Sequence, residues 1–118
     1  NIEVIGGVDI VAPWYEGAEF VVAPIFGGSG MKTKVAEALM FGKIVIGTPE
    51  SFSGYESIVN RAGCSCETAE EFITAIEAVS AMHKPGFDRE LRSRFLEQYS
   101  CEAARKRIAG IMSRALAS

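Results

Sequence analysis

A glycine-rich segment followed by two lysines is the part of this chain best suited to bind an anion. Gly27-Gly28-Ser29-Gly30 leads directly into a segment that carries Lys32 and Lys34. Glycines let backbone N–H groups approach a ligand closely and tolerate positive φ. The start of a helix attracts anions, because its N–H groups are free and its dipole is positive there. We therefore expect an anion site, suited to phosphate, at this loop and Lys32.

The two lysines stand where acidic residues are usual. The first turn of a helix favours Asp and Glu, yet the expected helix Met31–Phe41 has no acid before Glu37. A phosphate-bearing ligand would offset the two positive charges. The alternative is a solvated helix face on which Lys34 and Glu37 form an i, i+3 pair, which leaves the glycines unexplained. From its position in the helix alone, Glu37 is a solvated residue.

Two well-known phosphate-binding motifs do not fit this loop. A Walker A loop needs glycine immediately before its lysine and five positions earlier, where this chain has Met31 and Phe26. The dinucleotide-binding fingerprint needs a third glycine where Thr33 stands. The expected phosphate site is therefore of another kind.

The elements around the loop indicate a parallel sheet. Three short runs are continuously or almost continuously apolar: Ile2–Ile5, Phe20–Ile25 and Ile44–Ile46. Parallel strands that are buried on both faces have this pattern. One or two helical turns in Val11–Gly17, and the helix Met31–Phe41 with Val35, Ala38 and Leu39 on its apolar face, complete a βαβ pattern. We expect an α/β fold with a Rossmann-like parallel sheet of three to four strands and flanking helices.

Ligands of open parallel sheets bind beyond the carboxyl ends of the strands. Three loops are expected there: Gly6–Asp9, Phe26–Gly30 and Thr48–Ser51. The first two are rich in glycine.

The second half of the chain is expected to be mostly helical. A short helix over 55–61 and an edge strand over 64–67 come first. Thr68 and Glu71 form a capping box, and Lys84-Pro85-Gly86 ends the helix that follows. Asp88 and Ser100 cap the last two helices. The residues expected to face inward from these three helices are Phe72, Ile73, Ile76, Val79, Leu91, Phe95, Tyr99, Ala104, Ile108, Ile111 and Ala115.

Composition and charge exclude several classes of protein. With 118 residues, 48% hydrophobic and 23% charged, the chain fits one folded domain rather than a disordered or low-complexity segment. No apolar run approaches the roughly 20 residues of a transmembrane helix. The net charge of −3 and pI near 5.2 disfavour a nucleic-acid-binding protein. Basic side chains outnumber acidic ones over 88–118. We expect a solvated helix face there, because so short a basic run does not establish the alternative, a weak attraction to anionic lipid or phosphate.

The cysteines point to a reducing compartment. Cys64, Cys66 and Cys101 are odd in number, and no secretory signal precedes them. We expect small, buried apolar side chains rather than a zinc site, which needs about four ligands at regular spacing, and we predict no metal and no cofactor. The expected location is the cytoplasm, and peripheral attachment at the inner membrane face stays open.

The segment Pro24–Thr48, PIFGGSGMKTKVAEALMFGKIVIGT, resembles the donor-binding core of retaining GT-B-type glycosyltransferases, most closely the group called family 4. The matching features are a strand that ends in Pro, a glycine loop, a lysine-bearing helix start, Glu-Ala, Gly and a second apolar strand. The segments Gly6–Asp9, Trp14–Glu19 and Tyr99–Ala104 resemble the flanking parts of the same core. The likeness therefore covers nearly the whole chain.

The resemblance implies a two-domain enzyme with its site in the cleft between the domains. The C-terminal domain of such enzymes holds the nucleotide sugar and the N-terminal domain holds the acceptor. Residues 1–118 would then be part of the C-terminal donor domain, with the acceptor domain absent, which agrees with a chain that begins at Asn1 inside an apparent strand. The implied partners are a nucleotide-diphosphate sugar, a sugar or lipid-linked acceptor and the missing domain. The incomplete sheet also predicts self-association, such as a homodimer.

Individual residues acquire roles only where they match the family pattern. The family's helix glutamate, which binds the nucleotide ribose, corresponds to Glu37. The loop backbone near the diphosphate and sugar corresponds to Gly28, Ser29, Gly30 and Met31. Many members have a second glutamate at the place of Ser29, so the choice of donor sugar is not implied. Lys32 and Lys34 are candidate helpers for the diphosphate, and no catalytic residue is predicted.

Two other functions are compatible with this pattern. A nucleotide-sugar epimerase of the same fold would use the same donor site without an acceptor. A Rossmann-like module without catalytic activity would serve in assembly. Product analysis without acceptor tests the first, and the reading frame of the full-length protein tests the second.

Overall fold

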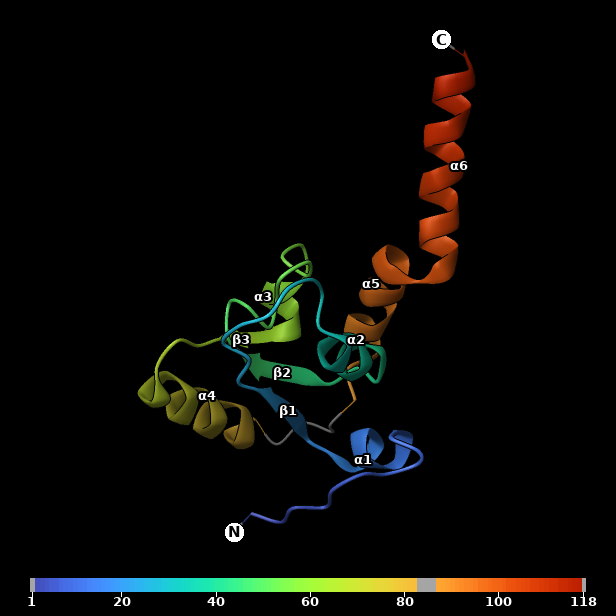
Figure 1. Ribbon diagram of the computed structural model, residues 1–118. Helices are drawn as coiled ribbons and strands as arrows, with labels where there is room; N and C mark the ends of the chain where they lie inside the picture. Colours follow the sequence, from blue (N-terminus) through green and yellow to red (C-terminus); the bar gives the residue numbers. More distant parts are fainter. Residues whose placement is uncertain (1, 83–86, 118) are drawn as a thin grey trace.

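The computed structural model describes residues 2–82 and 87–117 as a small parallel sheet between helices (Figure 1). The elements are α1 (Ala12–Gly17), β1 (Phe20–Ala23), α2 (Thr33–Met40), β2 (Ile44–Gly47), α3 (Val59–Ala62), β3 (Gly63–Ser65), α4 (Ala69–Ala81), α5 (Arg89–Tyr99) and α6 (Cys101–Ala117). The α/β class with a Rossmann-like parallel sheet is confirmed.

The sheet has the strand order β1-β2-β3, and both pairs are parallel. Phe20 pairs with Ile44 and Val45 pairs with Gly63. The predicted strands over 20–25, 44–46 and 64–67 are therefore found, each with slightly different bounds. The first of them ends at Ala23, because Pro24 has no N–H to donate to a neighbouring strand.

The predicted strand Ile2–Ile5 is wrong. This segment has no regular structure, and Ile2 and Val4 are 95% and 90% exposed. A strand needs a neighbour that satisfies its backbone groups, and the N-terminal segment runs away from the sheet (Figure 1). The glycine loop Gly6–Asp9 therefore does not lie at the end of a strand either.

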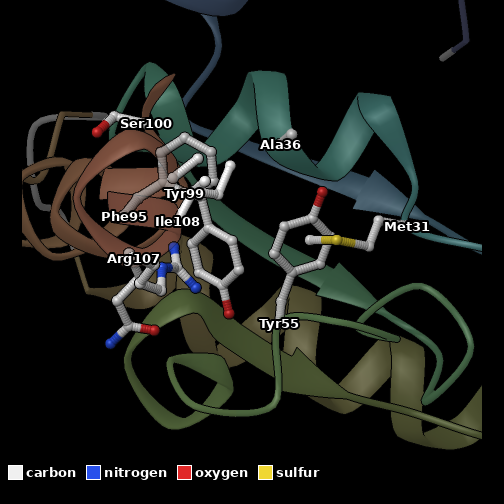
Figure 2. A pocket seen from close by; sticks show the side chains of 10 residues that line it. Met31, Ala36, Tyr55, Phe95, Tyr99, Ser100, Arg107 and Ile108 are labelled. Atoms are coloured by element: carbon white, nitrogen blue, oxygen red, sulfur yellow. The ribbon is translucent and has the colours of Figure 1, made fainter. Parts of the chain in front are cut away.

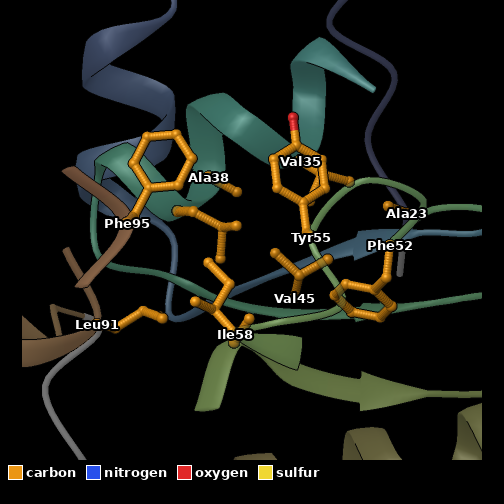
Figure 3. Packing of buried hydrophobic residues seen from close by; sticks show 11 residues of the cluster. Ala23, Val35, Ala38, Val45, Phe52, Tyr55, Ile58, Leu91 and Phe95 are labelled. Carbon is orange, nitrogen blue, oxygen red and sulfur yellow. The ribbon is translucent and has the colours of Figure 1, made fainter. Parts of the chain in front are cut away.

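The larger core lies between the sheet and helices α2, α3 and α5. Val45 points to this side, whereas its neighbour Ile46 points to the other. Figure 3 shows the cluster, whose buried members are Ala23, Val35, Ala38, Leu39, Val45, Phe52, Tyr55, Ile58, Ala62, Leu91 and Phe95. The predicted apolar faces of α2 and α5 are thus confirmed.

Helix α4 covers the opposite face of the sheet with a smaller cluster around Ile46, Cys66 and Ala75. Phe72, Ile76 and Val79 pack against it as predicted. Ile73 does not, because it is 57% exposed. A helix that packs on one face of a sheet buries only the row of side chains that points to that face, and Ile73 lies outside this row.

The predicted starts of the last three helices are confirmed. Thr68 and Glu71 form the capping box of α4. Asp88 accepts the backbone N–H of Leu91, and Ser100 accepts that of Ala103. The predicted end signal Lys84-Pro85-Gly86 lies outside the described residues. The short helix expected over 55–61 forms only as α3, after a series of turns.

Helix α6 extends away from the rest of the molecule (Figure 1). With this helix included, the described residues extend over 60 × 29 × 28 Å. Ala103 is its one buried residue within the described range. The prediction that Ala104, Ile108, Ile111 and Ala115 face inward is wrong, because all four are exposed. Their pattern gives the apolar face of the helix correctly, but these side chains stay exposed in the part of the chain that the structure describes.

The three cysteines differ in how far they are buried. Cys66 is buried as predicted, Cys64 is half-buried, and Cys101 is exposed, which contradicts the prediction. Cys101 is exposed because it begins the projecting helix.

Within residues 2–82 and 87–117, no helix combines the length and apolarity that a membrane crossing requires.

Candidate functional site

The glycine loop between β1 and α2 is fixed to the turn that follows β2. The hydroxyl of Ser51 donates to the carbonyl oxygen of Ala23 at 2.6 Å, and the hydroxyl of Thr48 donates to that of Ile25. Thr48 and Ser51 are buried. The two loops predicted to meet at the carboxyl ends of the strands, 26–30 and 48–51, therefore do lie together.

The backbone of the loop is arranged with unused donors. Gly28 and Gly30 have φ of +117° and +73°, which side-chain-bearing residues rarely adopt. The backbone N–H groups of residues 27–34 have no hydrogen-bond acceptor within the described parts of the chain. Val35 is the first to donate, to the carbonyl of Lys32. A row of free N–H groups at the start of a helix is suited to an anion.

Lys32 holds the loop together. Its ammonium group lies 3.0 Å from Glu50 Oε1, 3.1 Å from the carbonyl oxygen of Gly30 and 3.4 Å from that of Ser29. An ammonium group has three N–H donors, so these contacts occupy all of them. The anion that offsets Lys32 in this structure is therefore Glu50, a residue that sequence reasoning missed.

Lys34 is the other predicted cation of the site. It is exposed, and its ammonium group has no partner among the described residues. In particular, the i, i+3 pair of Lys34 with Glu37, which the sequence left open, does not form. Lys34 is free to approach a ligand in a way that Lys32 is not.

Glu37 is half-buried and turned toward α1. The hydroxyl of Tyr15 donates to Glu37 Oε2 at 2.9 Å, and the Tyr15 ring stacks on Phe41 with centroids 5.3 Å apart. Burial, and after it the hydrogen bond and the charge of Glu37, raise the pKa of Tyr15 to about 12. The Oε1 atom of Glu37 has no partner within the described residues, so one carboxylate oxygen is fixed and the other is available.

Tyr15 is a second residue that sequence reasoning missed. It lies 22 positions before Glu37, and only the fold brings α1 alongside α2. The one signal in the sequence was the aromatic pair Trp14-Tyr15 inside an otherwise weak helical segment.

Beyond the loop, Met31 contributes to an apolar cavity of about 440 Å³ (Figure 2). Tyr55 lies beside Met31 in that cavity and donates to the carbonyl oxygen of Lys32 at 3.2 Å. The loop is thus held through the side chain of Lys32 by Glu50 and through the carbonyl oxygen of Lys32 by Tyr55.

The structure places all seven predicted site residues in the loop before α2 or on its first turns. Gly28, Ser29, Gly30, Met31 and Lys32 form the loop, and Lys34 and Glu37 lie on the first turns of the helix. Chemically, this arrangement offers backbone donors to an anion and a carboxylate oxygen to a hydroxyl group. No side chain in it is placed as a nucleophile by the contacts described above.

Comparison with known proteins identifies the family. A family model described as "Glycosyl transferases group 1" matches residues 1–81, which include the glycine loop and Glu37. Neither the curated proteins nor the solved structures contain a match. The parallel sheet with flanking helices agrees with a Rossmann-like part of a GT-B enzyme. Since the match spans more than half of the sequence, the chain belongs to the group 1 glycosyltransferases.

Proposed function

We propose that this chain is the part of a glycosyltransferase that binds the donor, a nucleotide-diphosphate sugar. Residues 1–118 form part of a C-terminal donor domain, and another domain of the full-length protein supplies the acceptor site. The complete enzyme transfers the sugar to an acceptor hydroxyl, with retention of anomeric configuration as the family resemblance implies. The chain by itself is not catalytic.

The observation that carries the proposal is the row of free N–H groups over residues 27–34, one helical turn before Glu37. The N–H groups and the helix dipole hold the diphosphate. Glu37 Oε1 accepts a hydrogen bond from a ribose hydroxyl, while Tyr15 fixes the other oxygen. Exposed Lys34 adds a positive charge near the diphosphate, and Lys32 acts by keeping the loop in place.

This arrangement contributes to the reaction mainly through electrostatics. When the sugar leaves, negative charge grows on the nucleoside diphosphate. Preorganised N–H groups stabilise such charge without reorganising during the reaction. The chain therefore supplies leaving-group stabilisation and donor orientation, and acceptor activation belongs to the other domain.

Donor binding by the intact enzyme tests the proposal. Glu37→Gln removes the charge of the ribose ligand but keeps its shape. A charge-assisted hydrogen bond contributes roughly 1.5–3 kcal/mol, so affinity should fall about ten-fold or more. Calorimetric titration with nucleoside diphosphates measures it. Glu77→Gln, an exposed change on α4, is the matched control and should leave binding unchanged.

The ribose role would be rejected if Glu37→Gln keeps its fold and binds every nucleoside diphosphate with an affinity within two-fold of that of the parent. Epimerised nucleotide sugar formed without acceptor would reject transfer and indicate the epimerase alternative.

A further inference from the structure

A second cavity, of about 460 Å³, lies at the end of the sheet opposite to the glycine loop. Lys43 lines it and directly precedes β2, whereas the glycine loop follows the carboxyl end of β1. Because the two strands are parallel, their amino and carboxyl ends lie at opposite edges of the sheet. The cavity has the size of a small-molecule site, and its lining residues are Glu16, Met40, Phe41, Lys43, Phe87 and Arg92.

Lys43 brings a buried positive charge to this cavity. It is 3% exposed, and its ammonium group donates to the carbonyl oxygen of Glu16 at 3.3 Å. An ammonium group has three N–H donors, so the others are unused within the residues that the structure describes. A buried lysine is usually paired with an acidic group, yet none of the ion pairs formed by residues 2–82 and 87–117 includes Lys43. The wall of the cavity therefore carries a charge that no described side chain offsets.

Arg92 adds a second positive charge to the same cavity. Its Nε–H donates to the carbonyl oxygen of Met40 at 3.0 Å, and its other side-chain N–H groups have no partner among the described residues. The two carbonyl groups in contact with these cations lie at helix ends, that of Glu16 in α1 and that of Met40 in α2. The free carbonyl groups of helix ends attract cations. This attraction explains one donor of Lys43 and one of Arg92 but leaves the others unused.

The rest of the cavity wall is apolar and held in place. Phe41 stacks on Tyr15 with ring centroids 5.3 Å apart. Phe87 packs so closely on Gly42 that a Cβ there would lie 2.9 Å from its ring. Together with Met40, these two rings present an apolar surface beside the two cations. A wall that is fixed before binding loses less conformational freedom when a ligand enters.

Glu16 brings a carboxylate to the wall of the cavity. It is exposed and forms no ion pair within the described part of the chain. Its negative charge opposes an anionic ligand, so that removing this charge should strengthen binding. The alternative is that Glu16 turns inward and pairs with Lys43 itself, which would leave no unpaired charge for a ligand.

We propose that this cavity binds a small organic anion. A carboxylate or phosphate group of the ligand binds to Lys43 and Arg92, and its aromatic or aliphatic body lies against Met40, Phe41 and Phe87. The planar fork of an arginine holds such groups with paired hydrogen bonds. The cavity is separate from the proposed donor site, because none of its lining residues belongs to that site.

Small probes test the charged group and the apolar body on the intact protein. Calorimetric titration compares benzoate, phenyl phosphate and the neutral benzyl alcohol. At least one of the two anions should bind about ten-fold more tightly than the alcohol, because the alcohol cannot form charge-assisted hydrogen bonds of full strength. The tighter anion identifies the charged group that the cavity prefers. Inorganic phosphate should bind more weakly than phenyl phosphate, because it has no apolar body.

Variants locate the binding in the cavity. Lys43→Met and Arg92→Met should each weaken binding of the tighter anion about ten-fold and leave binding of benzyl alcohol unchanged. Arg92 is exposed, so Arg92→Met tests the proposal even if urea unfolding shows that Lys43→Met is not folded. Arg89→Met is the matched control and should change nothing, because Arg89 is exposed on the same helix but does not line the cavity. Glu16→Gln should strengthen binding about two- to five-fold. Glu37→Gln should bind the anion as the parent does, which separates this proposal from donor binding.

Four results would each overturn the proposal. The first is equal affinity for benzyl alcohol and both organic anions, or no binding of either anion. The second is anion binding that Lys43→Met and Arg92→Met leave unchanged, which would place the probe elsewhere on the protein. The third is binding of inorganic phosphate as tight as that of phenyl phosphate, which would give the apolar wall no role. The fourth is a loss of stability in Glu16→Gln that disappears when Lys43 is also changed to Met, which would make Glu16 the partner of Lys43.

Discussion

The hydrogen bond between Tyr15 and Glu37 should stabilise the protein by a measurable amount. Tyr15→Phe removes the hydroxyl 2.9 Å from Glu37 Oε2 and keeps the ring that stacks on Phe41. A hydrogen bond to a charged acceptor contributes roughly 1.5–3 kcal/mol. Because solvent reaches both half-buried groups and weakens the bond, we expect a loss at or just below the lower limit of that range, about 1–1.5 kcal/mol of the free energy of unfolding at pH 7.

A double-mutant cycle separates this bond from other effects of the substitution. Urea unfolding at pH 7 is measured for the parent, Tyr15→Phe, Glu37→Gln and the double variant. The two substitutions should be non-additive by at least about 0.5 kcal/mol, because they remove two ends of one contact. Tyr99→Phe is the control, since its hydroxyl donates to the neutral carbonyl of Gly54, and it should combine additively with Glu37→Gln.

The same bond predicts a dependence on pH. The pKa of Tyr15 rises from 10.0 to about 12 on folding. Between these values the unfolded chain has released the phenolic proton and the folded chain still holds it, so the free energy of unfolding falls as pH rises. Tyr15→Phe lacks this proton, and the stability gap between parent and variant should narrow from pH 10 to 12. Two results together would refute the reasoning: additive effects of Tyr15→Phe and Glu37→Gln on the free energy of unfolding, and a stability difference between parent and Tyr15→Phe that does not change between pH 10 and 12.

Other predictions follow from close approaches and exposure. Gly63→Ala should destabilise the protein by several kcal/mol in urea unfolding, on the order of a severe core clash, because a Cβ there would lie 1.7 Å from the carbonyl oxygen of Val45. In Ellman's assay, exposed Cys101 should react quickly. Cys66 is buried, and burial raises the pKa of its thiol, so it should react only when the protein unfolds. Equal reaction rates of the two thiols would contradict the burial of Cys66. In the intact enzyme, Lys32→Met should weaken binding of a nucleoside diphosphate and leave binding of the bare nucleoside nearly unchanged, because it loosens the loop that holds the diphosphate and not the ribose site; unchanged affinity for the diphosphate would contradict this role of Lys32.

Local patterns were enough to predict most of the elements. Apolar runs predicted the strands over 20–25 and 44–46, and the capping residues Thr68, Asp88 and Ser100 predicted three helix starts. These signals work because capping bonds and strand composition depend on residues a few positions apart. The run over 24–48 was likewise enough to predict the family that the comparison then showed.

Tertiary structure alone decided which of these elements found partners. Among the described residues, the segment Ile2–Ile5 has the composition of a strand but no neighbour to pair with, and Ile108 and Ile111 on the apolar face of α6 stay exposed. It also decided the partners of the site residues, because Glu50 lies 18 positions after Lys32 and Tyr15 lies 22 before Glu37. A sequence fixes which groups a residue carries. Contacts between distant residues depend on how the whole chain packs, and no local pattern records them.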